Sequence, residues 1–218
     1  MANQYMVAWG TLIFMILLCV DQFSGEKDYG MVPVQSVTKR GRRKLFCAKL
    51  LTCQLSALSV WAAANLVYFL ALCFFYGCGN LHSVVQDFSF NACPYNWNIG
   101  EYLAITLAVG LIASQLTALV VFMLARVSGN TQRSFAFIGG ALVLPYLFAS
   151  LIDHVWLSLW LPCLMDSQWL WNELRLLLIG KGYVPVWVIA GAELGLVAVI
   201  ASVMLHRFVE KAETVVDT

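Results

Sequence analysis

The sequence predicts an all-α membrane protein: a bundle of five transmembrane helices with an amphipathic interfacial helix on its outer side. Of its 218 residues, 61% are hydrophobic and only 11% are charged, whereas soluble domains carry about 25% charged residues. The hydrophobic residues gather in long runs, and the basic residues cluster between particular runs. The length suits one bundle without a separate soluble domain.

The first apolar run, residues 5–20, is short for a transmembrane helix. At about 1.5 Å per residue it reaches about 24 Å, less than the bilayer core of roughly 30 Å. A cleaved signal peptide is the alternative, but the residues before position 5 include none of the basic residues with which signal peptides begin. We therefore expect residues 1–22 to form a retained first segment, and four spans to remain if it is cleaved or not inserted.

Residues 23–49 form the only long polar stretch and hold a dense basic cluster. Such clusters stay on the cytoplasmic side of a membrane and fix the orientation of the neighbouring helices. They also attract anionic lipid headgroups. The sequence predicts a cytoplasmic loop whose topology anchors or headgroup contacts are Lys39, Arg40, Arg42, Arg43 and Lys44.

Residues 50–206 are expected to hold the four-helix core, followed by a cytoplasmic tail at 207–218. The predicted spans are 50–76, 101–126, 135–152 and 183–205, with outer loops at 77–100 and 153–182. With the amino terminus outside and the carboxyl terminus in the cytoplasm, eleven Lys and Arg side chains lie inside and two outside. This bias favours that orientation, in the plasma membrane or a membrane of the secretory pathway.

The two outer loops carry distinct predictions. The chain has seven cysteines, and an oxidising exterior would permit a disulfide between Cys78 and Cys93 in the first loop. Cys163 is an alternative partner for either one. In the second loop, the tryptophans and leucines of residues 166–179 recur with helical spacing, which predicts an interfacial helix lying flat on the membrane.

Small residues indicate where helices pack closely. Gly110 and Ser114 lie four residues apart in one predicted span, and Gly191 and Gly195 do so in another. Small residues at this spacing let two helix backbones approach each other in a membrane.

The last predicted span carries one charge, Glu193, near its centre. A carboxylate costs about 2.5–3.5 kcal/mol at the middle of a bilayer by insertion scales, so Glu193 requires a proton, a partner or water. Gln115 and Asn65, on other spans, are the candidate partners. Glu193 is either a protonated packing residue bonded to one of them, or the centre of an ion, proton or ligand site.

Signs of enzymatic activity are weak. The chain has no G-x-S-x-G, H-E-x-x-H or phosphate-binding-loop motif. The adjacent Asp153 and His154 suggest a lipid-modifying site at the outer interface, a distant third hypothesis. The sequence predicts no cofactor and no metal, and membrane topology explains the basic residues without nucleic acid.

These patterns favour a non-enzymatic component that organises or accompanies a larger membrane assembly, or acts in cell-surface contact. Its expected partners are the lipid bilayer and other membrane proteins or a second copy of itself. The alternative is a small transporter or channel that uses Glu193.

Overall fold

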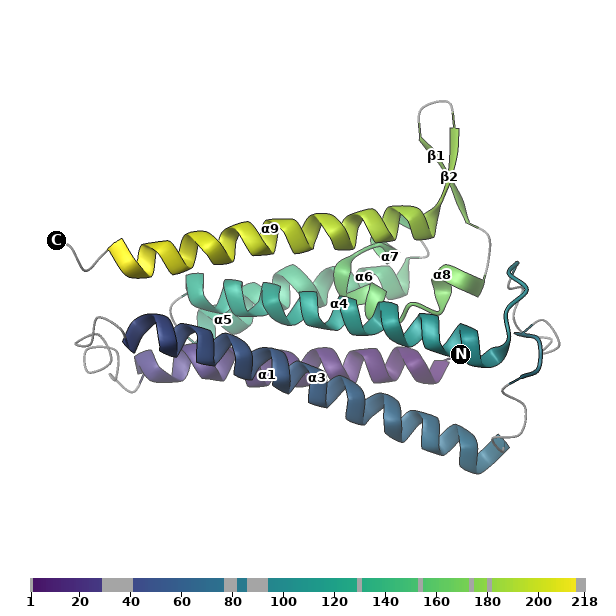
Figure 1. Ribbon diagram of the computed structural model, residues 1–218, viewed down its shortest axis with the longest axis horizontal. Coiled ribbons are helices and arrows are strands. Elements are labelled where there is room, and N and C mark those ends of the chain that lie inside the picture. The colour runs from purple at the N-terminus through teal and green to yellow at the C-terminus, as the bar shows by residue number, and fades with distance from the viewer. Residues whose placement is uncertain are drawn as a thin grey trace.

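Long helices run side by side along one axis of the molecule (Figure 1). The structure is a computed structural model that describes residues 2–28, 41–76, 82–85, 94–128, 131–152, 155–172, 175–179 and 182–214. The elements are α1 (Ala2–Asp28), α3 (Gly41–Tyr76), α4 (Ile99–Ser128), α5 (Thr131–Ile138), the π-helix η2 (Gly139–Val143), α6 (Leu144–Leu151), α7 (Val155–Ser158), the 3₁₀-helix η3 (Leu161–Met165), α8 (Trp169–Asn172), β1 (Leu176–Ile179), β2 (Gly182–Pro185) and α9 (Val186–Thr214).

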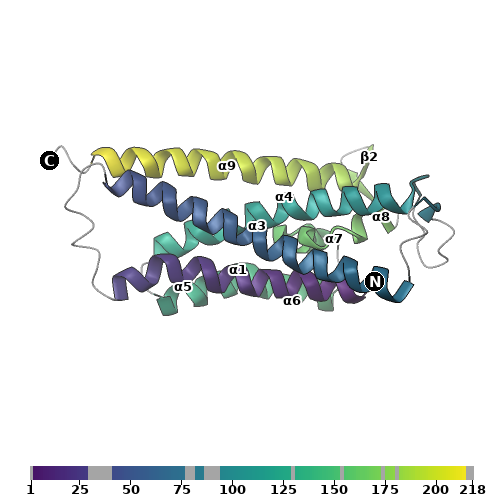
Figure 2. The same cartoon turned by 60° about the horizontal axis from the view of Figure 1, so that its bottom comes forward.

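Successive long helices alternate in direction (Figures 1 and 2). The amino terminus, the start of α4 and the β1–β2 hairpin lie at one end, which we call the hairpin end. The start of α3, the end of α4 and the carboxyl-terminal end of α9 lie at the other, which we call the basic end because α3 begins there among basic residues. The two chain termini therefore lie at opposite ends of the bundle.

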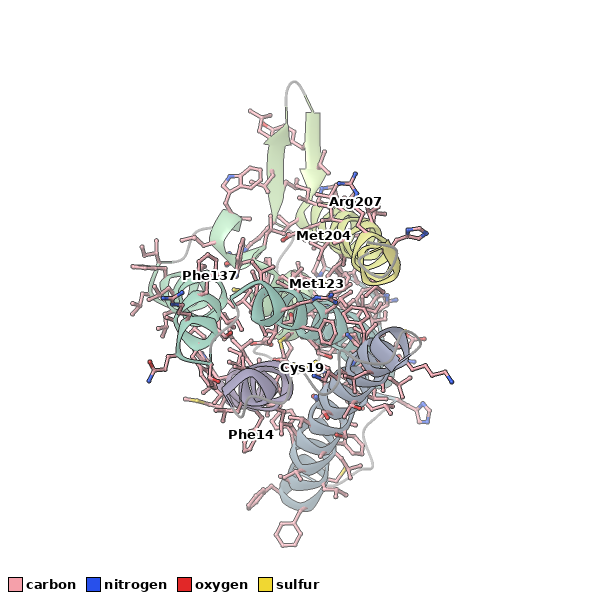
Figure 3. All side chains as sticks on the ribbon, turned by 90° about the vertical axis from the view of Figure 1, so that its left-hand side faces the viewer. Phe14, Cys19, Met123, Phe137, Met204 and Arg207 are labelled. Atoms are coloured by element: carbon pink, nitrogen blue, oxygen red, sulfur yellow. A yellow bond between two sulfur atoms is a disulfide. The ribbon has the colours of Figure 1, made fainter. Side chains whose placement is uncertain are left out.

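Helix α4 forms the centre of the bundle and contacts α1, α3, α5, α9 and η3. Within its most apolar stretch 44% of the residues are buried, compared with none in α3 and 11% in α9. The end-on view shows Met123 of α4 in the middle and Phe14 and Phe137 pointing outward from the flanking helices (Figure 3). Helices α3 and α9 thus present most of their apolar surface to the surroundings.

Three helices are long and apolar enough to cross a membrane, over Lys44–Phe75, Ile99–Val127 and Val186–Arg207. The apolar part of α1 is shorter, at Met6–Val20. The residues of the expected fourth span form α5, η2 and α6, which follow one another without a break over residues 131–151. The helical fold class is confirmed, with a two-stranded hairpin added to it.

The expected long polar loop is shorter in the structure. Helix α1 continues to Asp28, and α3 already begins at Gly41, so both ends of the stretch 23–49 are helical. Lys and Arg are good helix formers, and a helix that leaves an apolar environment keeps its own backbone hydrogen bonds in water. The charge pattern therefore did not mark the helix boundaries.

Pro145 lies in the first turn of α6, directly after the π-helix η2. A proline inside an α-helix removes one backbone hydrogen bond and crowds the preceding turn. The π-helix η2 lies between α5 and α6, so Pro145 lies close to the junction of η2 and α6. Single π turns often mark functional regions.

The predicted interfacial helix over residues 166–179 is wrong for most of its length. Among the described residues of this stretch, only Trp169–Asn172 is helical. Leu176–Ile179 forms strand β1 and pairs antiparallel with β2, Leu176 opposite Pro185 and Ile179 opposite Gly182. Residues 175–178 alternate between half-buried and exposed, the period of two that a strand requires. A run of leucines fits either period, so the helical spacing was misleading.

The last helix starts later than predicted, at Val186 instead of residue 183, because β2 occupies the residues before it. Pro185 closes the strand at the helix start, where the lack of a backbone N–H causes no loss. Glu193 is the eighth residue of α9, about 11 Å from its first residue at 1.5 Å per residue. It therefore lies midway between the first residue of α9 and the middle of this 29-residue helix.

Candidate functional site

The most unusual part of the structure is residues 155–172, which we call the inserted segment. It connects α6 to the hairpin through α7, η3 and α8, and it packs against the bundle (Figures 1 and 2). All five residues of η3 are buried, with Leu164 completely inaccessible and Met165 5% exposed. A segment predicted to lie on the surface is instead part of the core.

Three contacts fix the path of the inserted segment along the bundle. A Cβ atom on Gly110 of α4 would lie 2.9 Å from the Met165 backbone oxygen. The Ser167 hydroxyl donates a hydrogen bond of 2.9 Å to the backbone oxygen of Thr106. The Trp171 ring then meets that of Trp97, just before α4 begins, with 5.4 Å between ring centroids.

The inserted segment therefore runs along α4 from the level of Gly110 towards the hairpin end. Gly110 lies eleven residues after Ile99, the first residue of α4, a rise of about 16 Å. Non-α-helical backbone thus reaches far into the helical bundle. The sequence signals for this were Pro162, which interrupts an apolar run, and Gly110, which leaves room for a close backbone contact.

Glu193 faces an open pocket of about 460 Å³ between the inserted segment and α9. One wall of the pocket is formed by α9 residues spaced three and four apart, which share one helix face. The other wall is formed by α7 and the turn after it. Within the described residues, the carboxylate has no hydrogen bond and no ion pair. The lining residues are Trp156, Leu159, Trp160, Ile189, Ala192, Glu193 and Leu196.

Behind this pocket, the inserted segment holds a thiol and a second carboxyl group. The Cys163 thiol is buried and forms no disulfide, and it donates a hydrogen bond of 3.5 Å to the Leu157 backbone oxygen. One carboxylate oxygen of Asp166 is buried three residues later.

Several polar atoms at this level are buried without a hydrogen-bond partner in the described part of the chain. They include the hydroxyl of Thr106, one carboxylate oxygen of Asp166 and the indole nitrogen of Trp171. Thr106 is 1% exposed and Trp171 is 8% exposed. Buried polar groups almost always have a partner, so ordered water between the inserted segment and α4 is the simplest way to satisfy them.

The other two predicted intramembrane polar residues do not join Glu193. The Asn65 amide donates to the backbone oxygen of Trp61, one turn earlier in its own helix. Gln115 lies sixteen residues after the first residue of α4, about 24 Å along the helix, and its amide nitrogen is buried without a partner in the described structure. The structure thus leaves the three residues at separate places.

The predicted packing residues occupy two different environments. A Cβ atom on Gly110 would meet the Met165 backbone oxygen of η3 and the Trp61 indole of α3. Ser114 is fully buried, and its hydroxyl donates a hydrogen bond to the Leu111 backbone oxygen. Gly191 and Gly195 lie on the outward side of α9, where a Cβ atom would meet nothing within 4 Å. These two glycines contact no other helix within the described chain.

The disulfide that the structure describes joins Cys19 of α1 to Cys53 of α3, with 5.6 Å between the Cα atoms. Both residues are completely inaccessible, and the Cys53 sulfur lies 3.9 Å from the Ala118 backbone oxygen of α4. Sequence spacing gave no signal for this pairing. The predicted pair, Cys78 and Cys93, lies outside the described residues.

The remaining predicted positions fall mostly outside the described parts. Lys39 and Arg40, and the pair Asp153 and His154, lie outside the described residues. Arg42 and Arg43 lie in the first turn of α3, and the Lys44 side chain is exposed.

No family model, curated protein or solved structure matches this chain. Its function must therefore be argued from the geometry described above.

Proposed function

We propose that the protein is an integral membrane protein whose role is to pair with another membrane protein, as an accessory or organising component. The membrane part of this proposal is supported by three helices of sufficient length and apolarity, at Lys44–Phe75, Ile99–Val127 and Val186–Arg207. Helix α1 and the continuous run of α5, η2 and α6 are proposed as the other two crossings.

The inserted segment fits this proposal as a re-entrant segment. The apolar part of α4 has 29 residues, and a bilayer core accommodates about 20. Any 20 consecutive residues of this 29-residue part include residues 108–118. Gly110 therefore lies within the bilayer core wherever α4 is placed along the membrane normal. Non-α-helical backbone at that depth is tolerated only when protein surrounds it, in agreement with the burial of η3.

The proposed orientation keeps the basic end in the cytoplasm and the hairpin end outside, in the plasma membrane or a secretory-pathway membrane. Arg126 near the end of α4 and Lys44 near the start of α3 support this, because basic residues are retained on the cytoplasmic side. The Cys19–Cys53 disulfide lies within the bundle and is shielded from aqueous thiols on either side.

The observation that carries the pairing proposal is the outward side of α9, which has small residues and is covered by none of the described residues. Gly191 and Gly195 lie on it with nothing within 4 Å of a Cβ position. Ser202 continues the same stripe two turns later and is also exposed. Stripes of small residues mark helix–helix interfaces in membranes because they let backbones approach, and the described chain supplies no helix for this one.

Affinity purification of the intact protein in mild detergent, followed by particle mass and composition, tests the pairing. We expect a stoichiometric membrane partner with the wild-type chain and its loss with Gly195→Leu. Because a side chain at Gly195 meets no neighbour, this variant should fold normally. Val203→Leu, at an exposed position about 80° around α9 from Gly195, is the matched control and should retain the partner. A particle that holds only copies of this chain would count against an accessory role, and a monomer with no partner would refute the proposal.

A second candidate function is a small transporter or channel. It is favoured by the Glu193 carboxylate, which has no ion pair among the described residues and lies beside the non-α-helical inserted segment. Interrupted segments near the middle of a membrane are where transporters bind their substrates. Glu193→Gln in liposomes tests it: proton or ion flux through that carboxylate should disappear, whereas a protein that only pairs with a partner would show no flux in either form.

A further inference from the structure

We propose that the pocket between α7 and α9 binds a cationic amphiphile, with its ammonium group beside Glu193 and its hydrocarbon chain along the apolar wall. This site lies away from the glycine stripe of α9. Positions 191 and 193 are about 200° apart around the helix, so the inference does not depend on the proposed pairing. If Glu193 serves transport, the transported substrate would be a cationic amphiphile.

Charge complementarity selects the sign of the ligand. Among the described residues, Glu193 is the only ionisable one that lines the pocket, and it makes no ion pair with any of the others. A carboxylate in such apolar surroundings is costly unless an opposite charge accompanies it. An anionic headgroup would be repelled, and a zwitterionic phospholipid would bring a phosphate for which the lining offers no basic partner.

The lining also distinguishes an organic cation from a metal ion. Calcium and magnesium require several oxygen ligands, and the remaining lining side chains are two tryptophans and four aliphatic residues. Trp156 and Trp160 are 57% and 38% exposed, so their rings remain available to a ligand. Tryptophan faces attract ammonium groups, and quaternary ammonium ligands are commonly held by such rings.

The size and shape of the pocket suit a single hydrocarbon chain. Its volume of about 460 Å³ lies in the range of about 300–1,000 Å³ that small-molecule pockets occupy. Leu159, Ile189 and Leu196 supply apolar contacts along the two walls. The pocket is open towards the outside of the bundle, so a chain could enter it directly from surrounding lipid.

The test uses the full chain purified in dodecyl maltoside, with dodecyltrimethylammonium added below its micelle concentration. Binding is followed by native mass spectrometry and by the shift in thermal unfolding. Dodecyl maltoside is an uncharged competitor with the same chain, and dodecyl sulfate is the anionic comparison. We expect one saturable site for the cation, and binding weakened at least tenfold by Glu193→Gln, because a close ion pair in partly apolar surroundings contributes more than that.

Two further variants keep the test decisive. Glu101→Gln removes an exposed carboxylate at the start of α4 and should leave binding unchanged. Ala192→Phe fills the pocket without changing the charge and should abolish binding, which decides the matter if Glu193→Gln does not fold. Gly195→Leu should still bind the cation even if it loses its partner. Equal binding by wild type and Ala192→Phe, or equal effects of dodecyl sulfate, would overturn the proposal.

Discussion

Replacing Gly110 by alanine should destabilise the protein, because the new methyl group would press on the backbone of the inserted segment. The Cβ atom would lie 2.9 Å from the Met165 oxygen, and ordinary contacts of this kind begin near 3.4 Å. One of the two backbones must therefore move by about half an ångström. Neither moves freely, since Gly110 lies within α4 and η3 is held by its own hydrogen bonds, such as that from Cys163 to the Trp160 oxygen.

The magnitude follows from two opposing effects. Overpacking of a well-packed core typically costs about 1–3 kcal/mol, while exchange of glycine for alanine within a helix contributes roughly 1 kcal/mol in the other direction. Gly10 of α1 provides the control, because a Cβ atom there meets nothing within 4 Å. Gly10→Ala should show only the helix-propensity gain, so the two variants should differ by about 1–3 kcal/mol.

Thermal unfolding in dodecyl maltoside, followed by tryptophan fluorescence, measures this difference. For a chain of this size 1 kcal/mol corresponds to roughly 2–4 °C in Tm, so Gly110→Ala should melt between about 2 and 12 °C below Gly10→Ala. Ser167→Ala, which removes the hydrogen bond to the Thr106 oxygen, should lower Tm independently. Equal melting temperatures for the two glycine variants would refute the placement of the inserted segment against Gly110.

One more prediction concerns the buried disulfide. Cys19→Ser should destabilise the oxidised protein by about 4 kcal/mol, because the bridge to Cys53 closes a loop with a sequence separation of 34. An aqueous phosphine should reduce the bridge only once the protein unfolds, and rapid reduction of the native protein would contradict its burial.

The helical framework could be predicted from the sequence because apolar runs identify helices without knowledge of their neighbours. The relative directions of Gly191, Gly195 and Glu193 also follow from helix periodicity alone. The helix boundaries could not be predicted in the same way. Residues 41–49 belong to α3 despite their charge, because a helix can begin several residues before its apolar run.

The inserted segment could not be predicted, since its path depends on contacts distant in the sequence. Met165 follows the bundle because Gly110, 55 positions earlier, leaves room for its carbonyl group, and Ser167 bonds to Thr106 across a separation of 61 residues. The Cys19–Cys53 pairing likewise depends on how α1 and α3 pack. The pocket beside Glu193 exists only because the inserted segment brings Trp156 and Trp160 against α9.

Photocrosslinking in native membranes, before any detergent is added, tests the proposed pairing most directly. A photoreactive amino acid replaces Val199, an exposed residue beside the glycine stripe of α9, or Phe137, an exposed residue of α5. Pairing through α9 predicts a discrete protein adduct from position 199 and only lipid adducts from position 137. Lipid adducts alone from both positions would contradict the account.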